Sequence, residues 1–148
     1  MDGFICRAFF IGLVVYSLVY PQLTFTQSDP LTLQQQAIRR MDNVIETFRK
    51  TGDMFSAGEL AQAERELALS NQMLEERSDW SALALGLIKH GSIQRLRSNW
   101  SLAIELYGRA GEAARRAGNV AYQADALAWG ALAEWSRRNL GPAITNAT

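Results

Sequence analysis

The residue types that most often carry out chemistry in proteins are scarce in this sequence. It contains one cysteine, Cys6, and one histidine, His90. A single cysteine excludes an internal disulfide bond, and a structural zinc site needs four ligands drawn mainly from cysteine and histidine. Because no nucleophile or orienting partner is placed for His90, we expect it to be a packed helical residue rather than a general base. The sequence therefore predicts no catalytic residue, no metal and no cofactor.

Two pairs of acidic residues could suggest the acid and the base of a hydrolase. Glu64 and Glu66 are two positions apart, and Glu75 and Glu76 are adjacent. Side chains at these spacings point apart on a helix, so we interpret both pairs as parts of a solvated face. The chain also lacks a glycine-rich phosphate-binding loop. These observations predict a protein that is not an enzyme.

The composition fits a globular protein of one domain. Among 148 residues, 15 basic and 15 acidic side chains give a formal net charge of zero, and 48% of the residues are hydrophobic. That hydrophobic fraction is too high for a disordered chain. Because a nucleic-acid-binding domain normally carries an excess of basic residues, we expect no nucleic-acid partner.

Residues 1–26 have the pattern of a targeting segment. Arg7 precedes a run of 13 mainly apolar residues, from Ala8 to Tyr20, and a polar stretch follows. A helix of 13 residues is shorter than the roughly 30 Å hydrocarbon core of a membrane. The pattern favours a signal peptide cleaved before Gln27, with an uncleaved membrane anchor and a misassigned start codon as the alternatives. We expect the chain to be secreted or periplasmic, or anchored to a membrane by this segment.

The rest of the chain has the pattern of successive helices. From Leu31 onward apolar residues recur at helical spacing, and no segment alternates as a strand does. Ser78 or Asp79 is suited to begin the third helix and Asn99 the fourth, whereas Thr51-Gly52-Asp53 and Gly118 are suited to end helices. The sequence predicts an all-α fold in which residues 27–37 form a linker and helix start. The expected helices cover about 31–50, 57–77, 80–97, 100–117 and 120–138, with a short sixth helix from Asn139.

Each expected helix has an apolar stripe and a polar face. Two pairs of opposite charge on the fourth helix, Glu105–Arg109 and Glu112–Arg116, have the i, i+4 spacing that stabilises a helix slightly. The first and fifth helices show such stripes. They consist of Ile38, Met41, Ile45 and Phe48 in the first, and of Ala124, Leu127, Ala128, Ala131 and Trp135 in the fifth.

An internal repeat with a period of 40 residues relates these helices. When residues 79–108 are laid over 119–148, six positions are identical: Ala84/Ala124, Leu87/Leu127, Arg97/Arg137, Asn99/Asn139, Ala103/Ala143 and Ile104/Ile144. A fixed period of this length with two helices per unit is typical of a helical solenoid. The expected units are 38–77, 78–118 and 119–148, and the last is incomplete.

The middle unit resembles the tetratricopeptide repeat (TPR). Gly91 lies on its first helix, Asn99-Trp100 follows, and Ala103-x-x-x-Tyr107-x-x-Ala110 lies on its second helix. The resemblance implies antiparallel helix pairs in which small residues at 91 and 103 permit close approach and Tyr107 fills the gap. It also implies a protein-binding solenoid of about two and a half repeats.

A second stretch of sequence is similar to a more specific protein class. Residues 36–53 and 78–89 resemble the helical repeat region that precedes the caspase-like CHAT protease domain in some bacterial proteins. That domain needs a His/Cys pair, and this chain has His90 inside a repeat helix and Cys6 in the leader. The resemblance implies the alternative function of a truncated accessory or regulatory region that lacks its catalytic domain.

The expected function is a non-enzymatic interaction scaffold whose partner is a protein or peptide. First helices of such repeats line a concave groove, which gives a candidate contact surface. On the fifth helix three apolar residues have i, i+3, i+6 spacing, with Asp125 one turn earlier, and the preceding unit places polar residues on the matching face. The candidate residues are Lys89, Ser92, Arg95, Asp125, Trp129, Leu132 and Trp135.

The fifth helix is also expected to expose apolar surface. A sixth helix of about nine residues is too short to cover it or to be stable alone. We therefore expect an apolar patch at the C-terminal end, buried by a partner, by further sequence or by self-association.

Overall fold

The computed structural model describes residues 29–52 and 57–145, and only the backbone of 140–145. Within these ranges the chain forms α-helices and no strands, as the sequence predicts. The helices are α2 (Pro30–Thr51), α3 (Ala57–Glu76), α4 (Trp80–Leu96), α5 (Trp100–Ala117) and α6 (Val120–Thr145).

The residues expected to bound the helices lie where the sequence places them. Gly52 and Gly118 are both C-caps with positive φ, 70° and 66°, a conformation that glycine adopts at little cost. The carboxylate of Asp79 accepts a hydrogen bond from the backbone N–H of Ala82 and so caps α4. Asn99 stands at the N-cap position of α5, but its side chain makes no capping hydrogen bond.

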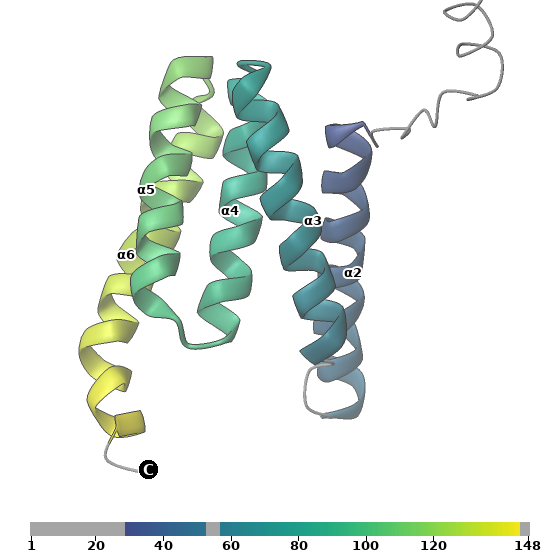
Figure 1. Ribbon diagram of the computed structural model, residues 1–148. Helices are drawn as coiled ribbons and strands as arrows, with labels where there is room; N and C mark the ends of the chain where they lie inside the picture. The colour runs from purple at the N-terminus through teal and green to yellow at the C-terminus, as the bar shows by residue number, and fades with distance from the viewer. Residues whose placement is uncertain (1–28, 53–56, 146–148) are drawn as a thin grey trace, which may run out of the picture.

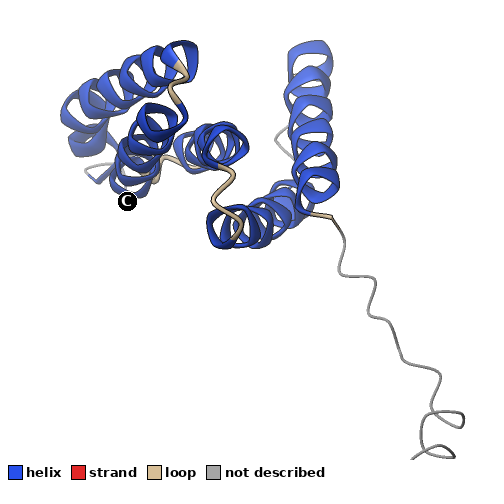
Figure 2. Cartoon of the chain, turned by 90° about the horizontal axis from the view of Figure 1, so that it is seen from above, coloured by secondary structure: helices blue, strands red, loops and turns tan. Residues whose placement is uncertain are grey.

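Consecutive helices lie side by side in chain order, with α2 at one edge and α6 toward the other (Figure 1). Besides its chain neighbours, α4 contacts both α2 and α6, whereas the described residues of α2 and α6 do not contact each other. The view from above shows an open array of helices rather than a closed bundle around one centre (Figure 2). Helix α4 is therefore the central element.

Two clusters of buried side chains form the core. The smaller cluster joins α2 and α3 to Ile93 of α4, and the larger one joins α4, α5 and α6 to Leu74 of α3. Helices α3 and α4 each contribute to both clusters. The contact between α3 and α4 therefore connects the two parts of the core.

The sixth helix predicted from Asn139 does not exist as a separate element. Helix α6 continues without a break from Val120 to Thr145. At the α4–α5 turn the amide of Asn99 donates to the side chain of Gln94, 3.2 Å away. In α6 the matching amide of Asn139 donates to the backbone carbonyl of Trp135 at 2.7 Å, an i−4 contact along the continuing helix.

The predicted apolar stripe of α2 is partly wrong, and that of α6 is wrong. In α2 the buried residues include Met41 and Val44, while Ile45 and Phe48 are exposed. In α6 the whole predicted stripe is exposed, and the residues that pack inward are Ala126, Ala133 and Ser136. Apolar residues surround most of α6, so contact with α5, rather than the pattern alone, selects the buried side.

One of the two predicted ion pairs forms. Arg116 Nε lies 3.1 Å from Glu112 Oε1, as expected. The other prediction, Glu105–Arg109, is wrong, because Arg109 Nη2 instead lies 3.2 Å from Glu75 Oε2 on α3.

The targeting segment predicted at 1–26 lies outside the described residues. Among the helices that the structure describes, none combines the length and the apolar character needed to cross a membrane.

Candidate functional site

The structure brings together the central residues of the predicted contact surface. The guanidinium carbon of Arg95 on α4 lies 5.0 Å from the centroid of the Trp129 ring on α6. At this distance the cation is attracted by the electron-rich face of the indole ring. The pair fixes α4 against α6, and it places a positive charge beside an aromatic surface.

The positive charges on this part of α4 are not neutralised by the described residues. Neither Lys89 nor Arg95 forms an ion pair with them, and Arg95 Nε is buried without a hydrogen-bond partner there. Because Nε is enclosed by the protein, a ligand would meet the remaining part of this half-buried guanidinium, whose positive charge favours an anionic acceptor. A carboxylate matches a guanidinium best, because it can accept two parallel hydrogen bonds.

On α6, Leu132 and Asp125 are exposed, and Trp129 is 37% exposed even with Arg95 against its ring. Asp125 makes no ion pair with the part of the chain that the structure describes. We call Lys89, Arg95, Asp125, Trp129 and Leu132 the α4–α6 face. Within it the structure shows the contact between Arg95 and Trp129, and Lys89 is half-buried.

Two other predicted residues are placed differently. Ser92 is half-buried: its hydroxyl donates to the carbonyl of Ile88 at 3.0 Å and lies 3.2 Å from the Tyr107 hydroxyl. Its hydrogen-bonding capacity is therefore largely used within the protein. Trp135 is 57% exposed. It lies four residues after Ala131, so it shares the stripe of Ala131 on α6 and not the stripe of Trp129 and Leu132.

His90 lies between α3 and α4 in a polar cluster around Glu64. Its Nε2 is 3.9 Å from Glu64 Oε1, and Gln94 and Arg97 also bond to the Glu64 carboxylate. Burial lowers the pKa of His90 below its usual range, and the nearby Glu64 carboxylate opposes this shift. The contacts are those of a packed residue that joins two helices.

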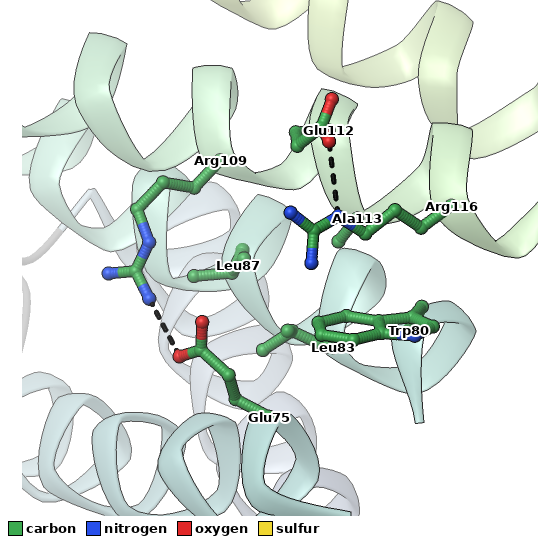
Figure 3. Close-up of a pocket in the computed structure, with 8 residues that line it drawn as sticks. All are labelled: Glu75, Trp80, Leu83, Leu87, Arg109, Glu112, Ala113 and Arg116. Carbon is green, nitrogen blue, oxygen red and sulfur yellow. Dashed lines mark hydrogen bonds and ion pairs between the residues drawn. The ribbon is translucent and has the colours of Figure 1, made fainter. Parts of the chain in front are cut away.

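The described residues contain no cluster of three or more His, Cys, Asp or Glu side chains that could hold a metal ion. They do line a small, half-open hollow of about 130 Å³ between α3, α4 and α5 (Figure 3). Leu83 and Leu87 are among its apolar lining residues, and the Glu75–Arg109 ion pair lies at its edge.

Sequence reasoning missed this hollow because it assigned Arg109 and Arg116 to partners on their own helix. The guanidinium of Arg116 in fact also lies 4.8 Å from the centroid of the Trp80 ring. A second hollow of about 210 Å³ shares Glu75, Leu87 and Arg109 with the first. The guanidinium groups of Arg109 and Arg116 already have partners within the protein. The two hollows therefore offer a ligand less unpaired charge than the α4–α6 face does.

Comparison of the chain with models of protein families, with curated proteins and with solved structures found no match. The function is therefore inferred from the contacts of the chain itself.

Proposed function

We propose that this protein is a non-enzymatic, TPR-like interaction scaffold that binds a protein or peptide on the α4–α6 face. The observation that carries the proposal is the Arg95–Trp129 contact, which sets an uncompensated cation beside exposed apolar surface. The apolar N-terminal segment supports a location outside the cytoplasm or at a membrane, where the scaffold would meet its partner.

The packing of α4 and α6 supports a repeat with the 40-residue register. Three residues of α4 face α3. Gly86 lies against Asn71, His90 lies near Glu64, and Ile93 belongs to the smaller core cluster. The matching α6 residues face α5: an added Cβ at Gly130 would lie 3.6 Å from Tyr107, and Ala126 and Ala133 belong to the larger core cluster. Helices one period apart thus use equivalent positions to contact the preceding helix.

The contact between α4 and α5 supports the TPR type in particular. A Cβ added to Gly91 would lie 2.8 Å from the Tyr107 ring, and Ala103 is fully buried. These are the positions at which the family resemblance implies small residues and a gap-filling aromatic ring.

The chemistry of the α4–α6 face indicates the kind of segment that would bind. Lys89 and Arg95 favour a carboxylate, and Trp129 and Leu132 favour an apolar side chain close to it. We therefore expect a peptide segment in which an acidic residue lies within a few positions of a leucine, a methionine or an aromatic residue.

Selection from a random peptide library displayed on phage, with the immobilised full chain as bait, tests the proposal. We expect enriched peptides to combine acidic and large apolar residues. The same selection with the Arg95→Glu variant should lose the acidic preference. Arg115→Glu serves as the matched control, because Arg115 is an exposed arginine on α5 outside the face. No enrichment, or an enriched set that is unchanged by Arg95→Glu, would contradict the proposal.

A further inference from the structure

The described residues leave one face of α6 uncovered, although its counterpart on α4 is buried. This uncovered α6 face consists of Ala124, Leu127, Ala128, Ala131 and Trp135, all exposed. Forty residues earlier, the first four positions are Ala84, Leu87, Ile88 and Gly91 on α4, which are all buried. The contrast is largest for the identical leucines, since Leu87 is 2% exposed and Leu127 is 68% exposed.

On α4 this face is covered by α5, which runs back along α4 after a short turn (Figure 1). The buried face of α5 includes Ala103, Leu106, Tyr107 and Ala110. The uncovered face of α6 repeats the same spacing, with alanine at the first and last positions and leucine at the second: Ala124, Leu127, Ala128 and Ala131. The uncovered face of α6 is thus equivalent in position to the face of α4 that α5 covers. It also has the residue spacing of the α5 face that covers α4.

We propose that the uncovered α6 face is covered by α6 of a second copy of this chain, in an antiparallel pair with Ala131 near the two-fold axis. Alanine at 124, 128 and 131 lets the two backbones approach closely, as small residues do where α4 meets α5. Leu127 lies four residues before Ala131, and Trp135 lies four residues after it. In the antiparallel pair, Leu127 of one copy therefore lies opposite Trp135 of the other. One surface then serves both subunits, as in most symmetric dimers.

Charge supports the antiparallel direction. The N-terminal half of α6 carries Asp125, and its C-terminal half carries Arg137 and Arg138 with Glu134. An antiparallel pair therefore brings an acidic end beside a basic end, and it also opposes the two helix dipoles. The formal net charge of the chain is zero, so two copies do not repel each other strongly.

Sedimentation equilibrium of the full chain, in mild detergent to shield the apolar N-terminal segment, measures this association. We expect a concentration-dependent monomer–dimer equilibrium. Leu127→Lys should weaken the dimer tenfold or more, because the ammonium group would be buried against apolar surface. Leu69→Lys on α3 is the matched control, because Leu69 is also an exposed leucine, and it should leave the dimer unchanged. Both substitutions are at exposed positions, so circular dichroism should show the same helix content in all three proteins.

Disulfide trapping tests the direction of the pair. In a Cys6→Ser background, Leu127→Cys and Trp135→Cys proteins mixed under mild oxidation should form the mixed disulfide faster than either forms a disulfide with itself. Leu69→Cys should form none. A monomer at all concentrations, a dimer that Leu127→Lys leaves intact, or trapping only between identical positions would overturn the proposal.

Discussion

The Tyr107 ring of α5 occupies the space directly in front of Gly91 on α4. A Cβ added to Gly91 would lie 2.8 Å from Tyr107 Cε1 and 3.1 Å from Cδ1, closer than ordinary van der Waals contact. The same tyrosine is 1% exposed, and its hydroxyl lies 3.2 Å from the Ser92 hydroxyl. The absence of a side chain at 91 therefore allows α4 and α5 to pack around this ring.

Replacing this glycine should destabilise the fold. Gly91→Ala places a methyl group against a ring that is held on all sides, so we expect a loss of about 1–3 kcal/mol in the free energy of unfolding. Urea denaturation followed by circular dichroism at 222 nm measures it. Gly108→Ala is the control on α5, because nothing lies within 4 Å of an added Cβ there. It should stabilise the helix by roughly 0.5–1 kcal/mol. Equal effects of the two substitutions would contradict the assigned α4–α5 contact.

A second close approach couples Gly86 to Asn71. A Cβ at Gly86 would overlap Asn71 Oδ1 and would lie 2.7 Å from Gln34 Nε2, and both amide side chains are buried. We expect Gly86→Ala to cost about 1–3 kcal/mol. Because neither polar atom of Asn71 has a hydrogen-bond partner among the described residues, Asn71→Ala should relieve the closer of the two clashes without breaking a hydrogen bond.

A double-mutant cycle measures this coupling. The Gly86→Ala/Asn71→Ala protein should be more stable than the sum of the two single effects, by about 0.5–3 kcal/mol. Additive effects would show that the two residues do not meet.

Ala103 tests the packing of the second helix in the middle unit. It is fully buried between α4 and α5 residues of the larger core cluster. Ala103→Leu should overpack this contact and lower the free energy of unfolding by roughly 1–3 kcal/mol. Thermal unfolding of wild type and variant checks this expectation, and an unchanged melting temperature would count against the repeat register.

Stability should fall as the pH drops below the ordinary pKa of histidine. Burial lowers the pKa of His90, Glu64 raises it, and Arg109 and Arg97 lower it further. Since the folded pKa is below the unfolded value of about 6.5, the unfolded chain binds the proton more readily there. The wild type should therefore lose more stability between pH 7.5 and pH 5.5 than a His90→Gln variant does. Identical losses in urea midpoint would show that His90 does not contribute.

The helix boundaries could be predicted from sequence because local residues determine them. Asp79 begins α4 because its carboxylate caps the first turn. Gly52 and Gly118 end their helices because each adopts a positive φ. The false break at Asn139 shows the limit of such signals. In the actual break, Asn99 donates to Gln94, but the residue equivalent to Gln94 is Glu134, whose carboxylate lies 2.9 Å from Arg137. Asn139 then bonds along the helix instead.

The buried side of α6 could not be predicted from its periodicity. Alanine, leucine and tryptophan occur around most of this helix, so several stripes are apolar enough to be buried. The structure selects Ala126 and Ala133, which pack with the larger core cluster. The partner of Arg109 was missed for a similar reason: Glu75 on α3 is distant in sequence and is brought near Arg109 on α5 because both helices pack against α4.

The candidate site was predicted in part. The pattern placed Arg95 and Trp129 on one surface, and the structure joins them at 5.0 Å. It did not reveal that Ser92 bonds to Tyr107. This contact depends on the rotation of α4 and α5 about their axes, which tertiary packing determines.

Isothermal titration calorimetry of the full chain with a selected acidic, apolar peptide tests the central claim most directly. The account predicts a 1:1 complex that Arg95→Ala and Trp129→Ala each weaken about tenfold or more, which corresponds to about 1.4 kcal/mol. Arg115→Ala should bind as tightly as the wild type. Wild-type affinity in both the Arg95→Ala and the Trp129→Ala proteins, with their helix content intact, would contradict the claim that the α4–α6 face binds the partner.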